Sequence, residues 1–210
     1  DLHSFPTRRS SDLPGYFAAA TELQDWAKNG YFNDGFNGVD YDSVWQDFSQ
    51  GTGIYLMAGS WLAPDLKAVL GDDVRFMLPP KSATMDKPAT TGGTGLPFAI
   101  TSAAKDPNVA AAYINFITNA EAMKVLAETG NVPVNGASTY AEGQTGVVHD
   151  VMTGFDTLTT QGEVLPYLDY ATTTFDQVLG DSLQSLLDSR TTPQDFLSAL
   201  EAAYTEHTAG

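Results

Sequence analysis

The chain has 210 residues, no cysteine, 42% hydrophobic residues and a formal net charge of −16. This is the composition of a globular protein that is long enough to bury a substantial core, and a disordered chain is excluded. The negative charge disfavours nucleic acids and anionic membranes as partners, the absence of cysteine excludes disulfides, and no apolar run approaches the roughly 20 residues of a membrane-spanning helix.

The first thirteen residues, DLHSFPTRRSSDL, stand apart from this acidic chain. Arg8 and Arg9 are too few for a nucleic-acid-binding arm, and no apolar stretch of about 7 to 15 residues follows them, as it would in a secretory signal. Residues 3–13 look like one reading frame through a sequencing adapter. We therefore expect residues 1–13 to be a non-native segment without stable contacts to the fold.

The first native elements are expected to be helical. Apolar residues at helical spacing predict an amphipathic helix over residues 17–27, which Gly30 ends. A second, short helix follows Asp42, which can cap it, and Gly51 ends it. We expect the apolar side chains of this short helix to be buried: Val44, Trp45 and Phe48.

Three short apolar runs predict strands over residues 54–58, 74–80 and 96–102. The first leads into a Gly-Ser turn, and two prolines close the second because proline lacks the donor that a central strand needs. A loop rich in Thr, Gly and Pro precedes the third. Strands that alternate with helices indicate an α/β fold.

Helices dominate the rest of the chain. Asp106 can cap a helix that begins at Pro107, and a further helical segment runs to Gly130. Weaker helical segments extend to residue 161, and two strong helices are predicted over residues 174–189 and 193–207, the latter with a capping-box-like start. The helix after Asp106 carries an apolar stripe: Val109, Tyr113, Phe116 and Ile117.

Motifs for metal, phosphate or nucleophilic chemistry are not found. Only His149 and His207 lie outside the first thirteen residues, so no metal site and no cofactor are predicted. TTGGTG lacks the Gly-Lys-Ser/Thr of a phosphate loop, DGFNGVDYD matches a calcium loop only in composition, and Ser60 has no Gly-X-Ser-X-Gly context. A carboxylate pair for glycoside hydrolysis stays open, because the many acidic residues allow some such pair.

Candidate binding residues are aromatic, small and acidic side chains at the ends of the predicted elements. Aromatic rings stack on sugar rings, carboxylates accept hydroxyl protons, and glycine lets the backbone approach a ligand. The alternative is that these aromatic side chains simply belong to the core. The candidates for a polyhydroxyl ligand are Ser60, Trp61, Gly93, Thr94, Tyr167, Asp169 and Tyr170.

Six segments occur in a distinctive order: ATELQDWAKNGYF, DFSQGTGIYLMAGSWL, VRFMLPP, GGTGLPFAITSAAKDPNVAAAYINFIT, AMKVLAETGNVPV and LDYATTTFDQVLGDSLQSLLDSRTTPQDFLSALEAAY. Together they resemble the C-terminal half of the extracellular sugar-binding proteins of ABC importers, the maltose-binding-like group. The resemblance spans residues 16–204. It implies a periplasmic-binding-protein-like fold of type II, with two hinged α/β lobes, here truncated and lacking most of the first lobe.

The resemblance also implies a division of the chain and a role for the candidate residues. Residues 14–78 and 136–210 would belong to the second lobe, and residues 79–135 would return to the first. Residues 74–80 would be a hinge crossing. Trp61 would stack on the ligand, the loop that contains Gly93 and Thr94 would meet it from the other lobe, and the residues from Tyr167 to Tyr170 would line the cleft.

The implied function is that of a non-enzymatic, monomeric substrate-binding subunit of a bacterial ABC transporter. It would capture a sugar or a related polyhydroxyl solute and deliver it to the permease subunits in the membrane. It would act in the periplasm or outside the cell, either free or lipid-anchored. The alternatives are a glycoside hydrolase and a binding protein for a non-sugar solute.

Overall fold

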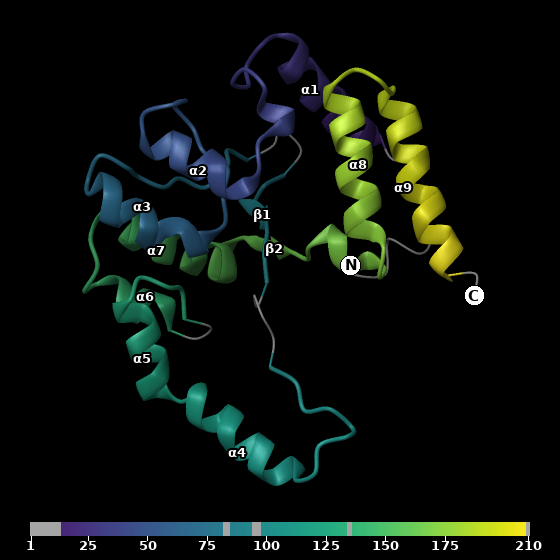
Figure 1. Cartoon of the computed structure of the whole chain (residues 1–210). Coiled ribbons are helices and arrows are strands. Elements are labelled where there is room, and N and C mark those ends of the chain that lie inside the picture. The colour runs from purple at the N-terminus through teal and green to yellow at the C-terminus, as the bar shows by residue number, and fades with distance from the viewer. Residues whose placement is uncertain (1–13, 82–84, 94–97, 134–135, 209–210) are drawn as a thin grey trace. The chain divides into compact units, whose positions relative to one another are not determined.

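The computed structural model describes residues 14–81, 85–93, 98–133 and 136–208 (Figure 1). The segment predicted to derive from an adapter, residues 1–13, lies outside the described residues. The chain divides into two compact units. Unit 1 combines the described residues up to Ile54 with those from Tyr167 onward, and unit 2 is Tyr55–Pro166. In the described residues, no helix combines the length and the apolar character needed to cross a membrane.

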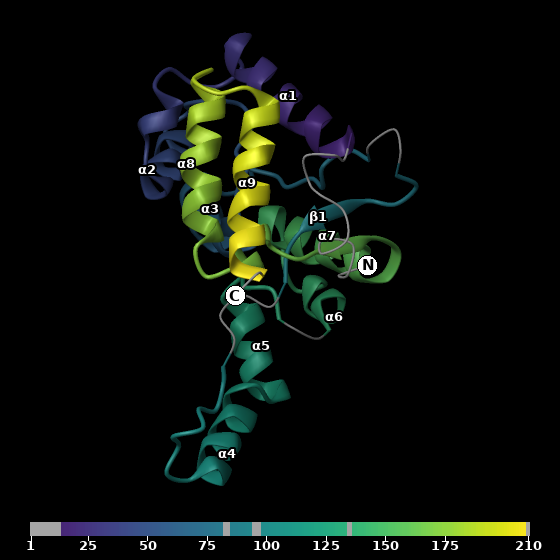
Figure 2. The same cartoon turned by 90° about the vertical axis from the view of Figure 1, so that its right-hand side faces the viewer.

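Unit 1 is built from helices of both ends of the sequence. Helix α1 (Pro14–Lys28) packs with α8 (Phe175–Leu187) and α9 (Pro193–Thr208), as Figure 1 and Figure 2 show. The unit also holds η2 (Phe36–Gly38), α2 (Tyr41–Ser49) and η4 (Leu168–Ala171). Its core is an apolar cluster shared by the three long helices: Ala20, Phe175, Leu186, Phe196, Leu197 and Leu200.

One buried polar side chain connects α1 to the turn between α8 and α9. Gln24 is 6% exposed, and its amide Nε2 donates to the carbonyl oxygens of Leu186 and Thr191, both at 3.0 Å. Its Oε1 accepts a hydrogen bond from Lys28 Nζ at 2.8 Å. The carbonyl of Leu186 also accepts from the N–H of Ser189 at 3.0 Å, so Gln24 adds a second donor there and supplies one to Thr191, while its own buried amide is satisfied.

Unit 2 is organised around α7 (Gly146–Gln161), which carries the most extensive buried face of its helices. Helices α3 (Ala63–Leu70) and α6 (Ala137–Ala141) pack on α7, and α5 (Ala120–Glu128) connects α6 to α4 (Pro107–Ile117). A short helix, η3 (Ser60–Leu62), precedes α3. The buried side chains come mainly from α3 and α7: Leu62, Ala63, Leu66, Val147, Val148, Val151, Met152 and Leu158.

The strands described in unit 2 form a two-stranded parallel sheet. In this sheet, β1 (Ala89–Thr91) pairs with β2 (Glu163–Leu165), so that Thr90 lies opposite Val164. Neither strand was expected from the sequence. Parallel strands with helical connections agree with the α/β prediction in kind, but helices make up most of the described chain.

The helices predicted from local signals are confirmed. The Asp106 carboxylate accepts from the backbone N–H groups of Asn108 and Val109 at the start of α4, and Thr192 and Asp195 form the predicted cap of α9. Helix α2 is also present, but its cap is Asp40, two residues earlier than predicted. None of the α2 side chains is fully buried, which corrects the expectation for Val44, Trp45 and Phe48.

The three predicted strands are wrong for the residues that the structure describes. Residues 54–58, 74–80 and 98–102 are irregular and make no strand pairing. A strand exists only where a neighbour supplies partners for its backbone groups, and these runs have no such neighbour among the described elements. Many of their side chains are exposed instead, with Tyr55 and Met57 each 83% exposed.

The Gln24 hydrogen bonds predict a measurable loss of stability in a Gln24→Ala variant. We expect the free energy of unfolding of unit 1 to fall by about 2 kcal/mol, because the variant loses the two hydrogen bonds from Gln24 to the carbonyls of Leu186 and Thr191. Urea denaturation followed by circular dichroism measures the change. Gln177→Ala is the matched control, since Gln177 is an exposed glutamine on α8. Equal midpoints for the two variants would contradict the importance of the Gln24 contacts.

Candidate functional site

Trp61 is the most exposed of the predicted ligand-stacking residues whose side chains are described. It lies in η3 and is 54% exposed, while the next two residues, Leu62 and Ala63, are buried at 6% and 3%. Ser60, the first residue of η3, is exposed as well. The chain therefore presents an indole ring at the surface of unit 2, directly before two buried residues. We call these residues, Leu62 and Ala63, the base of Trp61.

Gly59 accommodates the Trp61 ring. A Cβ atom built on Gly59 would fall among Cη2, Cζ2 and Cζ3 of the Trp61 indole. The φ of Gly59 is −78°, so backbone strain is not the reason for glycine here. The reason is space: the ring lies directly over the Gly59 Cα, and any side chain at this position would displace it.

The base beneath Trp61 is tied to the rest of unit 2 by two contacts of α3. Pro64 packs on the turn that ends α5, where a Cβ on Gly130 would lie 3.1 Å from Pro64 Cγ. Lys67 Nζ donates to the carbonyl oxygen and the hydroxyl of Thr145, at 3.0 and 3.1 Å, just before α7. A ring held on an anchored helix loses little conformational freedom when it binds a ligand.

Gly93 follows the carboxyl end of β1. The N–H of Gly92 donates to the carbonyl oxygen of Leu165 at 2.8 Å and so extends the parallel ladder by one residue. A Cβ on Gly92 would lie 3.1 Å from Val164 Cγ1, a tight fit that favours glycine. Gly93 itself is exposed. Thr94, the other residue predicted in this loop, lies outside the described residues.

The remaining predicted site residues belong to unit 1. Tyr167 is half-buried and precedes η4, which contains Asp169 and Tyr170. The side chains of Asp169 and Tyr170 lie outside the described part of the structure. Ser60 and Trp61 thus share η3, while Gly93 and Tyr167 belong to other elements. That all seven predicted residues form one ligand site stays a prediction.

A polar clamp that the sequence did not reveal holds the segment predicted as a hinge. Arg75 donates from Nε and Nη2 to the two carboxylate oxygens of Asp150 on α7, at 2.6 and 2.8 Å, and the N–H of Phe76 donates to Asp150 Oδ2 at 3.2 Å. Hydrogen bonds to a carboxylate favour its charged form. Those from Arg75 in particular hold the pKa of Asp150 below its ordinary value.

One helical turn beyond Asp150, Gly154 makes room for the Phe76 ring. A Cβ on Gly154 would lie 2.7 Å from Phe76 Cε1. Asp150 and Gly154 are four residues apart and therefore share one face of α7. A glycine inside an otherwise helical pattern was the available signal for this packing, but only the structure identifies the partner.

The described residues show no arrangement for a bound metal. Among them, no group of three or more His, Cys, Asp or Glu side chains is placed to hold a metal ion. The described candidate residues can supply stacking on Trp61 and hydrogen bonding from exposed backbone and hydroxyl groups.

Comparison with known proteins gives one family. The family model described as "Bacterial extracellular solute-binding protein" matches residues 9–150, which is more than half of the chain. The matched region contains Trp61, Gly93 and the Arg75–Asp150 clamp, and it starts inside the segment predicted to derive from an adapter. No curated protein matches the chain.

The lowered pKa of Asp150 predicts how stability depends on pH. The charged carboxylate is favoured in the folded state, so its contribution is complete above the unfolded pKa of about 3.9 and is lost as the pH falls through the lower folded value. Asp150→Asn should therefore be less stable than the parent at pH 7, and the difference should shrink below about pH 4. Urea midpoints measured from pH 7 to pH 3 provide the test.

The control for this titration is Glu128→Gln, which removes one partner of the exposed Lys124–Glu128 pair at 3.7 Å. Exposed ion pairs contribute little to stability, so this variant should stay close to the parent throughout. If Asp150→Asn behaved like Glu128→Gln, the clamp would not stabilise unit 2.

Proposed function

The chain belongs to the bacterial extracellular solute-binding proteins, and on that premise we propose that it is part of the substrate-binding subunit of an ABC importer. The subunit captures a sugar or a related polyhydroxyl solute and delivers it to the membrane permease. It works by binding and release without catalysis. It is a monomer in the periplasm or outside the cell, either free or lipid-anchored.

The observation that carries the sugar assignment is the presentation of Trp61. The indole is 54% exposed and so is accessible to a ligand, and its flat apolar face fits the C–H face of a sugar ring. The buried base and the space over Gly59 hold the ring in place before a ligand arrives. Asp169, Tyr167 and Tyr170 are the polar partners that we propose for the hydroxyl groups.

Two alternatives make different chemical demands. A glycoside hydrolase needs two carboxyl groups about 5 to 9.5 Å apart at the bond that it cleaves, and the family match does not favour this role because solute-binding proteins act in general without catalysis. A binding protein for a non-sugar solute would use the same scaffold with other polar partners, since a fold does not determine its ligand.

Ligand-induced thermal stabilisation tests the proposed function. The protein expressed from the complete gene is heated with each of a panel of mono- and oligosaccharides, and we expect one class to raise the melting temperature. At a ligand concentration of 100 Kd the gain is about 2.7 kcal/mol. Trp61→Ala should abolish the gain, Trp61→Phe should keep part of it, and Gly59→Ala should reduce it by displacing the ring.

Tyr31→Ala is the matched control, because Tyr31 is an aromatic residue of unit 1 that is 70% exposed and is not among the predicted site residues. It should keep the full gain. Stabilisation by amino acids or peptides but by no sugar would overturn the sugar assignment. Release of a chromophore from aryl glycosides, lost in the Trp61 variants, would favour the hydrolase.

A second observation supports the proposal that the full protein contains a further lobe. Helix α4 has no buried residue, and Val109, Tyr113 and Phe116, which share one of its faces, are between 61% and 71% exposed. Phe98 is 64% exposed as well. Large apolar side chains that are exposed together on one helix face often mark an interaction surface. We propose that a part of the same polypeptide outside the printed sequence, the first lobe, covers it.

Substitution on this face has opposite effects in the two forms of the protein. In the 210-residue chain, Val109→Ser combined with Phe116→Ser should reduce the binding of an apolar dye without lowering the urea midpoint. In the protein from the complete gene the same pair should lower the midpoint, because each buried apolar side chain contributes about 1.5 to 3 kcal/mol. An unchanged midpoint in the longer protein would show that nothing covers α4.

A further inference from the structure

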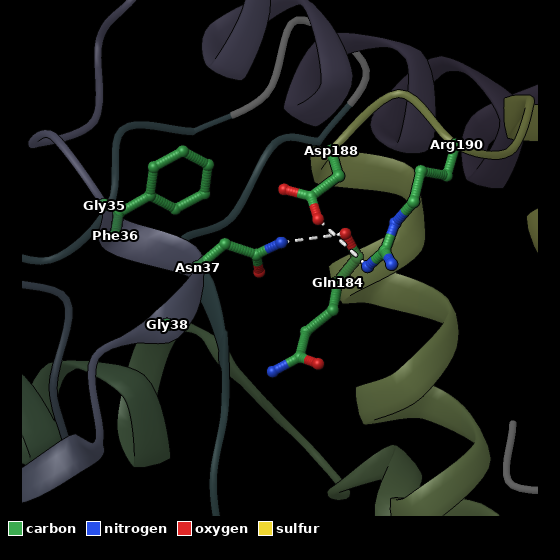
Figure 3. A pocket seen from close by; sticks show the side chains of 7 residues that line it. All are labelled: Gly35, Phe36, Asn37, Gly38, Gln184, Asp188 and Arg190. Carbon is green, nitrogen blue, oxygen red and sulfur yellow. Dashed lines mark hydrogen bonds and ion pairs between the residues drawn. The ribbon is translucent and has the colours of Figure 1, made fainter.

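A hollow in unit 1 lies beside the C-terminal end of α8 (Figure 3). We call it the α8 hollow. Its volume is ≈ 440 Å³, within the range of ligand pockets. One side is the turn at Gly35 with Phe36 and Asn37, and the other is Gln184, Asp188 and Arg190. All of these residues belong to unit 1, and none is a predicted sugar-binding residue.

The two sides of the hollow are joined by a hydrogen bond. Asn37 Nδ2 donates to the backbone carbonyl oxygen of Gln184 at 2.9 Å, and the same oxygen accepts from the N–H of Asp188 at 3.0 Å. This bond uses only the backbone of Gln184, and in Figure 3 the Gln184 side chain extends away from α8. The hollow therefore combines two amide side chains, each with a donor and an acceptor.

A residue with left-handed backbone angles, Ser189, lies between Asp188 and Arg190, the two charged residues that line the hollow. Ser189 has a φ of 56°, and its N–H and that of Arg190 close the α8 terminus on the carbonyls of Leu186 and Ser185. Glycine usually occupies this position because it adopts such angles without strain. The reversal of the chain at Ser189 lets Arg190 Nη2 reach Asp188 Oδ2 at 2.9 Å.

The charges of the hollow balance, and this selects the class of ligand. The Asp188–Arg190 pair carries no net charge, and the two side chains are 43% and 64% exposed, so both can still reach a ligand. An anion would meet the negative end of the α8 dipole and a protein of net charge −16. A cation would be attracted by these same charges, but at the hollow it would meet the Arg190 guanidinium and would have to displace it from Asp188. A neutral molecule with hydroxyl groups can bond to both members of the pair without separating them.

Phe36 supplies the apolar part of the hollow. It is half-buried, and its ring packs on Phe32 with the ring centroids 4.8 Å apart. A phenyl ring held in this way offers a fixed apolar surface to the C–H groups of a ligand. An apolar wall opposite a set of donors and acceptors matches a ring that has hydroxyl groups at its edge and C–H groups on its face.

From these contacts we propose that the α8 hollow is a second binding site for an uncharged polyhydroxylated ring of monosaccharide size. The ring lies against Phe36 and bonds to Gln184 and the Asp188–Arg190 pair. This site is separate from Trp61 and does not depend on the ligand assignment made for Trp61. Because it is open to solvent and lined by exposed side chains, its affinity falls in the millimolar range.

Titration of the ¹⁵N-labelled 210-residue chain with sugars, followed by NMR, tests the site. We expect a monosaccharide such as methyl glucoside, galactose or arabinose to shift the amide signals of residues 35–38 and 184–190 in a saturable way. Sodium acetate and methylammonium chloride are the charged probes and should not do so. Saturable shifts from a charged probe alone would overturn the neutral class of ligand.

Variants on α8 locate the ligand. Gln184→Ala removes a lining side chain while leaving the backbone bond to Asn37, and it should weaken binding about three- to tenfold, the worth of a neutral hydrogen bond. Asp188→Asn should weaken it about tenfold or more, because bonds to a charged acceptor are stronger. Gln177→Ala is the matched control on the same helix and should bind like the parent.

The outcomes separate this proposal from the function proposed for Trp61. Trp61→Ala should leave the shifts at the α8 hollow unchanged. No saturable shift with any sugar, or equal weakening by Gln177→Ala and Gln184→Ala, would overturn the α8 site and leave the Trp61 proposal intact. Loss of all sugar shifts in Trp61→Ala would place the binding at Trp61 and overturn the second site. The spectra themselves report that each variant is folded.

Discussion

The carbonyl groups at the C-terminal end of α8 are the constraint on which unit 1 depends. Side-chain amides from the first forty residues hold this end on two sides: Gln24 bonds to Leu186 and Thr191, and Asn37 bonds to Gln184. Sequence separations of well over one hundred residues are thereby closed by polar contacts, and the apolar cluster of α1, α8 and α9 packs around them. The α8 hollow exists only because this helix end is held against the Gly35 turn.

In unit 2 the corresponding role falls to α7. One face of α7 binds the segment after α3 through Asp150 and leaves space for the Phe76 ring at Gly154. The buried residues of α7 pack against α3. The packing of α3 on α7 fixes the position of Trp61, because α3 begins directly after η3. This arrangement suits the role proposed for Trp61, because a ring that stacks on a ligand must be accessible and the elements that carry it must be rigid.

The net charge and the exposed apolar face of α4 both bear on the proposal that the whole protein contains a further lobe. The charge of −16 disfavours self-association, whereas α4 exposes an apolar face. The segment with this face, within residues 79–135, is the one that the family resemblance assigns to the first lobe. The exposure observed in the structure and the division expected from the sequence both support the proposal that a first lobe covers this face.

The sequence by itself determined the helices, because their signals are local. Asp106, Thr192 and Asp195 act within one turn of the helices that they cap, so the pattern of side chains is sufficient to place them. It also determined the family through the order of its segments, which the match to residues 9–150 confirms at the level of solute binding. The tertiary structure decided the features that depend on contacts between residues far apart in the sequence.

The apolar runs at residues 54–58 and 74–80 have the composition of strands, yet a strand forms only when another strand accepts its hydrogen bonds. The bonds from Gln24 to Leu186 and Thr191, the Arg75–Asp150 clamp and the Asn37–Gln184 bond each join residues at least 70 positions apart. No local pattern encodes such a pairing, because the free energy that selects it arises only when the two segments meet in the fold.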